Sequence, residues 1–220
     1  MRLENVLNKK IQFCFIFGAL CASATEPAGT VSDVRADRRT GFVLAGGASR
    51  RMGSDKALLG GENGSLLLRV TSIVEAAAGS AIVVAPPGRY EDMGVPVLSD
   101  RWPGEGPLGG IVTALEFSRD PLNLIVAVDM PWLDVLTLRE LVVSAGETGR
   151  SVIPVHDDGA TEPLCAVYHR NDLPALRAFF DGGGRRVRDA IGQISYQPVP
   201  AAERVFANVN TPEEWEAARA

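Results

Sequence analysis

The sequence is short of the residues on which metal- and histidine-dependent chemistry usually relies. Its 220 residues include three cysteines and two histidines. Three cysteines are too few for a disulfide framework and do not form a zinc-site pattern. Two histidines argue against a Ser-His-Asp triad or a multi-histidine metal centre. The formal net charge of −5 argues against a general electrostatic affinity for nucleic acid. Any chemistry must therefore depend on other residue types.

Short apolar runs alternate with helical patterns along the first half of the chain. Residues 41–45, 81–85 and 124–128 are continuous apolar runs, which predict strands buried on both faces. Apolar residues recur at helical spacing over residues 66–77 and 107–117. Further strands are predicted at residues 95–98, 152–155 and 164–168, and further helices at 138–145 with Asp134 as a candidate cap, at 173–182 and from 211.

This order of elements predicts a doubly wound α/β fold, in which helices cover both faces of a mostly parallel sheet. No internal repeat and no change of composition divides the body of the chain. We therefore predict a single domain over residues 40–220 and treat residues 1–39 as an N-terminal extension.

The strongest local signal is the stretch from Leu44 to Lys56, LAGGASRRMGSDK. A predicted strand ends at the glycine pair Gly46-Gly47, whose backbone N–H groups can approach a ligand and bind an anion. Arg51 and Lys56 bring positive charge to the same place. The spacing matches neither the Walker A motif nor the dinucleotide-binding GxGxxG motif. The glycine pair alone favours a simple turn followed by a solvated basic helix, but the whole string favours a phosphate-binding function.

Two aspartates and a second glycine-rich stretch follow predicted strands. Asp129 lies at the carboxyl end of the strand 124–128, where open α/β sheets bind their ligands, and magnesium bridging phosphate oxygens would neutralise it. A turn aspartate is the alternative, because Asp-x-Pro also makes a good turn. Asp100 could bind a second metal ion, hold a nucleotide or form a turn. Residues 106–110 let the backbone approach a flat base or a sugar, or simply precede a helix.

Taken together, these segments resemble the molybdenum cofactor guanylyltransferases. The pattern Leu-Ala-Gly-Gly-x-x-x-Arg-Met-Gly-x-Asp-Lys at residues 44–56 is similar to their signature. The resemblance continues in the same order through the C-terminal end, at Asp100, Gly106-Pro107-Leu108-Gly109-Gly110, Asp129-Met130-Pro131 and residues 162–168, 185–187 and 208–214. It implies a Rossmann-like fold and a reaction that transfers GMP from GTP to the phosphate of molybdopterin, with Mg2+ as cofactor.

The resemblance also implies which residues act. It implies catalytic roles for Lys56, Arg51 and Asp129. It implies that Asp129 and Asp100 bind the metal ion. Molybdoenzymes or their chaperones are implied as partners that receive the product. Nucleotide binding is implied for Leu44, Ala45, Gly46, Gly47, Lys56, Asp100, Gly106, Pro107 and Leu108.

The choice of GTP over CTP rests on a few positions, since cytosine-using relatives tend to carry Leu-Ala-Ala-Gly at the first turn. A cytidylyltransferase, a transferase acting on another small molecule, and a non-catalytic nucleotide-binding module are the alternative functions.

The C-terminal part supplies the candidates for binding the acceptor. Arg185 and Arg186 follow three glycines, and guanidinium groups bind phosphate in bidentate fashion; a solvated basic turn is the alternative. Asn208 and Asn210 alternate, so their side chains share a face and could bind phosphate or metal-bound water, or could cap the last helix. Cys165 is predicted to pack in a strand. His156 and His169 are predicted at the surface.

The N-terminal extension resembles a secretory signal. Lys9 and Lys10 precede the apolar run 11–22, and Ala22-Ser23-Ala24 resembles a signal-peptidase site. The run is too short to span a bilayer comfortably, so no membrane partner is expected. Because the rest of the chain is predicted to consume a cytosolic nucleotide, we interpret residues 1–24 as a translated upstream stretch and expect a cytoplasmic protein. Genuine export, with a mature start at Thr25, is the alternative.

Overall fold

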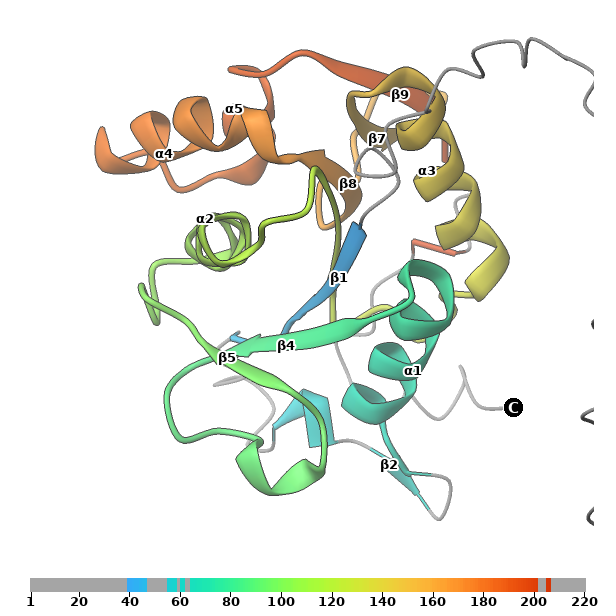
Figure 1. Cartoon of the computed structure of the whole chain (residues 1–220), viewed down its shortest axis with the longest axis vertical. Helices are drawn as coiled ribbons and strands as arrows, with labels where there is room; N and C mark the ends of the chain where they lie inside the picture. The colour runs from blue at the N-terminus through green and yellow to red at the C-terminus, as the bar shows by residue number, and fades with distance from the viewer. Residues whose placement is uncertain (1–38, 47–54, 59, 62–63, 202–204, 207–220) are drawn as a thin grey trace, which may run out of the picture. The chain divides into compact units, whose positions relative to one another are not determined.

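A computed structural model describes residues 39–46, 55–58, 60–61, 64–201 and 205–206. These residues form one α/β domain around a seven-stranded sheet of order β5-β4-β1-β6-β8-β7-β9 (Figure 1). The N-terminal extension up to residue 38, the last predicted helix, and the candidate residues Gly47, Arg51, Asn208 and Asn210 lie outside the described residues. For Lys56 only the backbone is described.

The sheet is mixed but mostly parallel, as the apolar runs predicted. Strands β5 (Val97–Ser99), β4 (Ala81–Ala85), β1 (Arg39–Leu44) and β6 (Leu122–Ala127) pair in parallel. Strand β8 (Cys165–His169) runs antiparallel to β6 and to β7 (Ser151–Val155), and β7 pairs in parallel with β9 (Tyr196–Pro200). Strands β2 (Gly60–Gly61) and β3 (Gly64–Ser65) pair antiparallel in a separate two-stranded sheet.

Helices cover both faces of the sheet (Figure 1). Helices α1 (Leu66–Ala78) and α3 (Val135–Thr148) pack on one face, and α2 (Pro107–Phe117), α4 (Leu173–Asp181) and α5 (Val187–Ile191) on the other. The Asp134 carboxylate accepts a 2.9 Å hydrogen bond from Thr137 N, which confirms the predicted cap of α3. Three short 3₁₀ helices are η1 (Lys56–Leu58), η2 (Glu91–Met93) and η3 (Arg170–Asp172).

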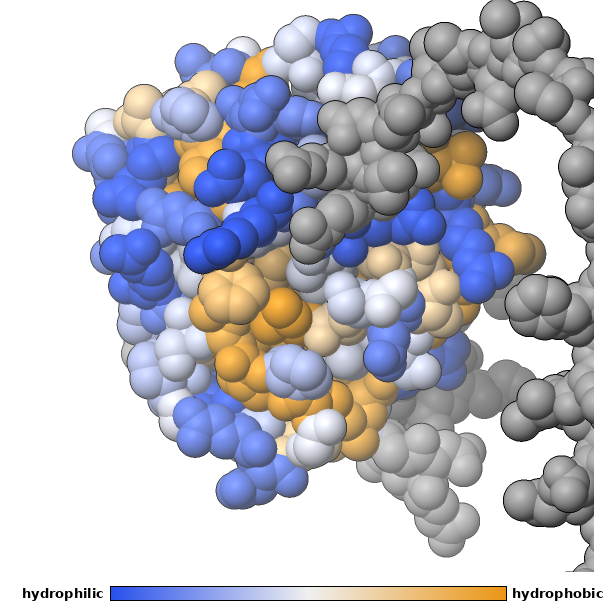
Figure 2. Space-filling view, viewed as in Figure 1, coloured by the Kyte–Doolittle hydropathy of each residue, from blue (hydrophilic) through white to orange (hydrophobic). Residues whose placement is uncertain are grey.

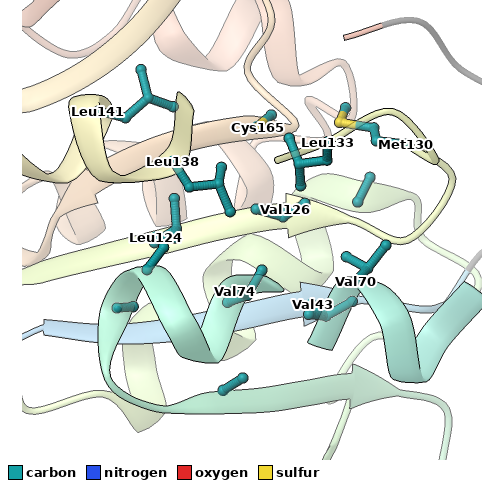
Figure 3. Close-up of a cluster of buried hydrophobic side chains, with 14 of the residues drawn as sticks. Val43, Val70, Val74, Leu124, Val126, Met130, Leu133, Leu138, Leu141 and Cys165 are labelled. Carbon is teal, nitrogen blue, oxygen red and sulfur yellow. The ribbon is translucent and has the colours of Figure 1, made fainter. Parts of the chain in front are cut away.

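The two faces of the sheet belong to two separate hydrophobic clusters. On one side Val43 and Val126 of the sheet pack against Val74 of α1 and Leu138 of α3 (Figure 3). On the other side the sheet packs against α2, α4 and α5. Burial on both faces explains why these strands are continuous apolar runs. Cys165 is fully buried in the first cluster, so its predicted packing role is confirmed.

Both histidines, predicted at the surface, are only partly exposed. The His156 side chain is 15% exposed, because its Nε2 lies 2.9 Å from Glu162 Oε1 and the ring of Phe206 packs against it edge-on. His169 is half-buried at the end of β8, where its Nδ1 accepts a hydrogen bond from Asn171 N. Both rings take part in local structure through polar contacts that no spacing in the sequence reveals.

The surface mixes polar and apolar areas. On the face shown in Figure 2, apolar side chains gather near the middle, and hydrophilic side chains predominate toward the left and upper edges of the described part. Within the described part of the chain, no helix has both the length and the apolar character that a membrane span requires.

Candidate active site

The predicted site residues follow strands that end at the same edge of the sheet. Leu44 of β1 is in register with Val84 of β4 and with Ala127 of β6. Val128 N donates a 3.1 Å hydrogen bond to Leu44 O, so the segment leading to Asp129 runs beside the segment leading to Gly46. Asp100 N donates a 2.7 Å hydrogen bond to Ala85 O at the end of β4. The carboxyl edge of four parallel strands therefore carries the candidate residues, as ligand sites of open α/β sheets do.

Gly46 and Asp100 lie next to each other. A Cβ atom placed on Gly46 would stand 3.7 Å from Asp100 Oδ2 and 3.9 Å from Pro86 Cδ. Both are ordinary van der Waals distances, so the structure sets Gly46 beside the Asp100 carboxylate without excluding a small side chain at that position. It brings together two residues that are far apart in the sequence.

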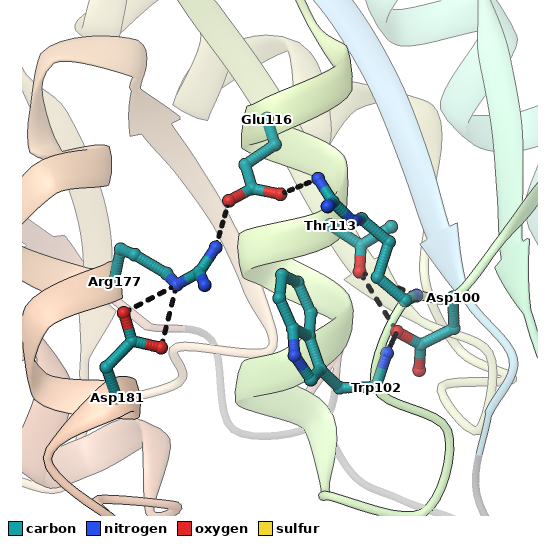
Figure 4. A network of polar contacts seen from close by, with 7 residues as sticks. Asp100, Trp102, Thr113, Glu116, Arg177 and Asp181 are labelled. Carbon is teal, nitrogen blue, oxygen red and sulfur yellow. Dashed lines mark hydrogen bonds and ion pairs between the residues drawn. The ribbon is translucent and has the colours of Figure 1, made fainter.

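Asp100 is held in a fixed orientation. Its side chain is buried, and Oδ1 accepts 3.0 Å hydrogen bonds from Trp102 N and from the Thr113 hydroxyl (Figure 4). The Thr113 oxygen in turn accepts a 3.2 Å hydrogen bond from Arg101 N. Oδ1 is therefore committed to the protein, whereas Oδ2 faces Gly46. One oxygen orients the group and the other is directed toward the edge of the sheet.

Asp129 lies on a loop that the core anchors. Asp129 is half-buried, while the next residue, Met130, is 1% exposed and Leu133 is 2% exposed in the first cluster (Figure 3). Leu133 N donates to Met130 O, and Asp134 then caps α3. The buried methionine and leucine fix the turn, so the Asp129 carboxylate stays at the end of β6.

Lys56 is the first residue of η1. Its neighbour Ala57 is 2% exposed in the first cluster, which fixes the chain at this point. The Asp55 carboxylate contacts Arg89 and accepts a 2.7 Å hydrogen bond from the Tyr90 hydroxyl. Arg89 and Tyr90 lie in the loop that follows β4, so the start of η1 lies beside that loop. Burial, followed by the bond to Asp55, raises the pKa of Tyr90 above its ordinary value.

The start of α2 combines backbone exposure with close packing. Gly106 has φ +87° and precedes Pro107 at the first turn. The Leu108 side chain is fully buried, so a ligand could contact only its main chain. A Cβ on Gly109 would lie 3.2 Å from Trp102 Cβ, and one on Gly110 would lie 3.2 Å from Leu44 Cδ2. Packing of α2 alone accounts for this second glycine pair.

Arg185 lies beside the start of α2. Its Nε donates to Glu105 Oε2 over 2.7 Å, and Nη1 donates to Phe180 O and Gly184 O. The guanidinium also lies 4.2 Å from the centre of the Phe180 ring. A phosphate that bound Arg185 through Nε would have to displace Glu105, which is 50% exposed. Arg186 is exposed and precedes α5.

The fold agrees with what comparisons with known proteins show. The family model described as MobA-like NTP transferase domain matches residues 41–199. The chain belongs to this family. A probable molybdenum cofactor guanylyltransferase from Nostoc is 37% identical over 183 residues, covering 80% of this chain and 87% of the relative. One from Chloroflexus aggregans is 32% identical over 189 residues, covering 80% and 90%.

Solved structures show the fold of the MobA-like transferases. Molybdopterin-guanine dinucleotide biosynthesis protein A from Archaeoglobus fulgidus superposes with a TM-score of 0.68 at 24% identity, covering 81% of this chain and 96% of that one. The 2-C-methyl-D-erythritol 4-phosphate cytidylyltransferase from Thermus thermophilus superposes with a TM-score of 0.61 at 15% identity, covering 80% and 95%. Enzymes named for different nucleotides share this fold, so the fold alone does not select the base.

The MobA-like domain also contains a support for Asp100 that the sequence did not reveal. The Trp102 ring lies 5.2 Å from the Arg101 guanidinium and 4.7 Å from that of Arg177 in α4. Glu116 of α2 pairs with both arginines, and Arg177 also pairs with Asp181 (Figure 4). These contacts hold the segment after Asp100 against α2 and α4. Its partners are far apart along the chain, so no local motif predicts it.

Proposed function

We propose that the chain transfers GMP from GTP to the terminal phosphate of molybdopterin, with release of pyrophosphate. Membership of the MobA-like family and the names of the Nostoc and Chloroflexus relatives support this substrate pair. The structural observation that carries the proposal is the position of Gly46 beside the buried Asp100, with Asp129 following the neighbouring strand. Such an edge suits a ligand with both an anionic part and a flat base.

The reaction requires positioning more than proton transfer. The acceptor phosphate is already ionised at neutral pH, so its oxygen can attack the α-phosphorus of GTP without a general base. The enzyme must hold the two phosphates in line and cancel the charge that gathers on the α-phosphate and on the leaving pyrophosphate. We assign these roles to Lys56, Arg51 and the backbone amides of the Gly46-Gly47 turn.

We assign Asp100 to the nucleotide rather than to a metal ion. Oδ1 already accepts two hydrogen bonds, which leaves Oδ2 as a single acceptor of fixed direction. A carboxylate oxygen held in this way suits N–H donors, and guanine presents N–H donors on its edge. The main chain at Leu44, Ala45, Gly106, Pro107 and Leu108 would line the same nucleotide.

Asp129 fits magnesium binding. Magnesium usually takes one or two protein carboxylates and completes its coordination with water and substrate phosphates. The described residues contain no cluster of three or more His, Cys, Asp or Glu side chains, which excludes an all-protein cage among them but suits this mode. Bound magnesium would supply positive charge to the phosphate oxygens. Asp129, anchored by Met130, would hold the ion at the end of β6.

The acceptor would bind on the side of α2 and α5. Arg185 lies against the start of α2, where a Cβ on Gly106 would stand 4.0 Å from Arg185 O. We propose that Arg185 and Arg186 bind the molybdopterin phosphate and that Asn208 and Asn210 contribute polar contacts. Both substrates are cytosolic in this scheme, so we place the activity in the cytoplasm, with molybdoenzymes or their chaperones as recipients of the product.

Pyrophosphate release tests this proposal. Release that requires GTP, molybdopterin and magnesium together supports transfer. A non-catalytic nucleotide-binding module would be stabilised by GTP, by about 2.7 kcal/mol at 100 times its Kd, yet would release no pyrophosphate. Release with CTP in place of GTP would identify a cytidylyltransferase instead.

A further inference from the structure

The loop after β4 holds the residue that immediately precedes Lys56. The Tyr90 hydroxyl donates a 2.7 Å hydrogen bond to Asp55 Oδ2, and the Arg89 guanidinium pairs with the same oxygen. The Asp55 side chain is 18% exposed and that of Arg89 is 37% exposed, so the contact is partly shielded from water. Two donors from another part of the chain therefore converge on one carboxylate oxygen.

The other Asp55 atoms organise η1. Oδ1 accepts a 3.2 Å hydrogen bond from Ala57 N, and the Asp55 main-chain oxygen accepts a 3.0 Å bond from Leu58 N. Ala57 itself is buried in the first cluster. Lys56 therefore lies between Asp55, whose carboxylate is held by Arg89 and Tyr90, and the buried Ala57. Any movement of Asp55 would move the start of η1 with it.

The backbone at Tyr90 has an uncommon conformation. Tyr90 is the single non-glycine residue with positive φ among the described residues, at φ 63°. A bulky side chain in the left-handed region costs free energy, and such strain persists only where the surroundings impose it. At this residue the Tyr90 hydroxyl bonds to Asp55, and the Arg89 guanidinium lies 5.0 Å from the Tyr90 ring centre.

We propose that Arg89 and Tyr90 are positioning residues, which fix Asp55 and thereby place Lys56 for the triphosphate. This inference rests on the proposed function, because it assumes that Lys56 contacts phosphate. Preorganised cations contribute most when they need no rearrangement as the reaction proceeds. Arg89 also neutralises Asp55, so this carboxylate does not compete with phosphate for the lysine next to it.

Hydrogen exchange of the full chain tests the positioning without requiring turnover. Tyr90→Phe removes a single oxygen atom and keeps the ring. We expect the amides of Ala57 and Leu58 to exchange about tenfold faster in this variant, because the bond that holds Asp55 is lost. Amides in α3 should be unchanged. Tyr196→Phe, on the edge strand β9, is the matched control and should leave Ala57 and Leu58 as in the wild type. Unchanged exchange in Tyr90→Phe overturns the proposal.

A double-mutant cycle tests the link to catalysis. We expect Tyr90→Phe to lower kcat/KM for GTP about tenfold, and to have no further effect in an Asp55→Ala background, because the hydroxyl acts through Asp55. Arg89→Lys should retain more activity than Arg89→Met. Losses that multiply in the double variant overturn the positioning role. A wild-type protein without turnover would count against the proposed function, and hydrogen exchange would still decide whether Arg89 and Tyr90 fix the start of η1.

Discussion

The Thr113 hydroxyl donates a 3.0 Å hydrogen bond to Asp100 Oδ1, and both side chains are buried. Thr113 lies in the middle of α2, whereas Asp100 directly follows β5. The bond therefore lets helix α2 set the orientation of the Asp100 carboxylate, which we propose contacts the nucleotide. The carboxylate is set by the scaffold rather than by the ligand, which is the arrangement that precise binding requires.

Thr113→Val should destabilise the fold and weaken GTP binding. Valine keeps the shape of threonine but leaves Asp100 Oδ1 and Arg101 N each without one partner, at a cost of about 1–3 kcal/mol. Urea unfolding measures the stability, and titration with GTP measures the affinity. Thr71→Val is the matched control, because the buried Thr71 hydroxyl has no hydrogen-bond partner among the described residues. Equal effects of the two substitutions would show that the Asp100 contact contributes nothing specific.

Replacing glycine by alanine should have opposite effects on stability at two positions in the fold. In β1, a Cβ on Gly41 would stand 2.4 Å from Val74 Cγ1 and 2.6 Å from the Ser80 carbonyl oxygen. Gly41→Ala should therefore destabilise the protein by about 1–3 kcal/mol or more, because a backbone atom must move. Gly146 of α3 has open space around it, so Gly146→Ala should stabilise by about 0.5–1 kcal/mol. Thermal unfolding compares them, and a stable Gly41→Ala protein would contradict the described packing of α1.

Stability should fall at alkaline pH. Burial raises the pKa values of Cys165, Tyr168 and Tyr90 in the folded protein, whereas the unfolded chain has the ordinary values. Each group therefore contributes stability that is complete below its ordinary pKa and is lost as the pH rises above it. The free energy of unfolding should decline by about 1.4 kcal/mol per pH unit once the thiol titrates, and more steeply once the tyrosines do.

Urea unfolding from pH 7 to pH 10.5 measures this decline. Cys165→Ala removes the first group, so the onset should move from about pH 8.5 to about pH 10. A curve with the same onset in both proteins would mean that the thiol keeps its ordinary pKa when folded.

Much of the fold could be predicted from the sequence because its strands and helices carry strong patterns. The apolar run before Gly46 became β1, and the helix beginning at Pro107 has the predicted bounds. Strand β9 was missed because residues 196–200 contain two prolines and are only partly buried, as an edge strand can be. Helix α5 was missed because five residues are too few for a periodicity to show.

The candidate site was predictable only where a single segment carried the signal. Gly46, Asp100 and Asp129 could be named because each follows an apolar strand, and their common edge follows from parallel pairing. Arg89, Tyr90 and Trp102 could not be named, because their roles depend on contacts with Asp55 and Arg177, which are distant in sequence. Helix packing suffices to explain the second glycine pair, Gly109-Gly110, whereas the nucleotide-binding role of residues 106–108 stays a prediction.

Asp129→Ala and Lys56→Ala should abolish turnover and leave the fold intact. Each removes a group that would offset charge on the phosphates, and loss of one such group commonly lowers kcat by about 10²–10³-fold. Pyrophosphate release measures the rate, and the urea midpoint measures the fold. Glu147→Gln, on the exposed face of α3, is the control and should behave as the wild type. Removal of magnesium with a chelator should stop the wild-type reaction, and its return should restore it. Near wild-type rates in either variant would remove that residue from the mechanism.

The most direct test of the account is to offer the protein all four nucleoside triphosphates together with molybdopterin and magnesium, and to determine the product by mass spectrometry. We expect one product, molybdopterin extended by GMP, with pyrophosphate released in equal amount. A product extended by CMP, or consumption of GTP without any transfer to molybdopterin, would contradict it.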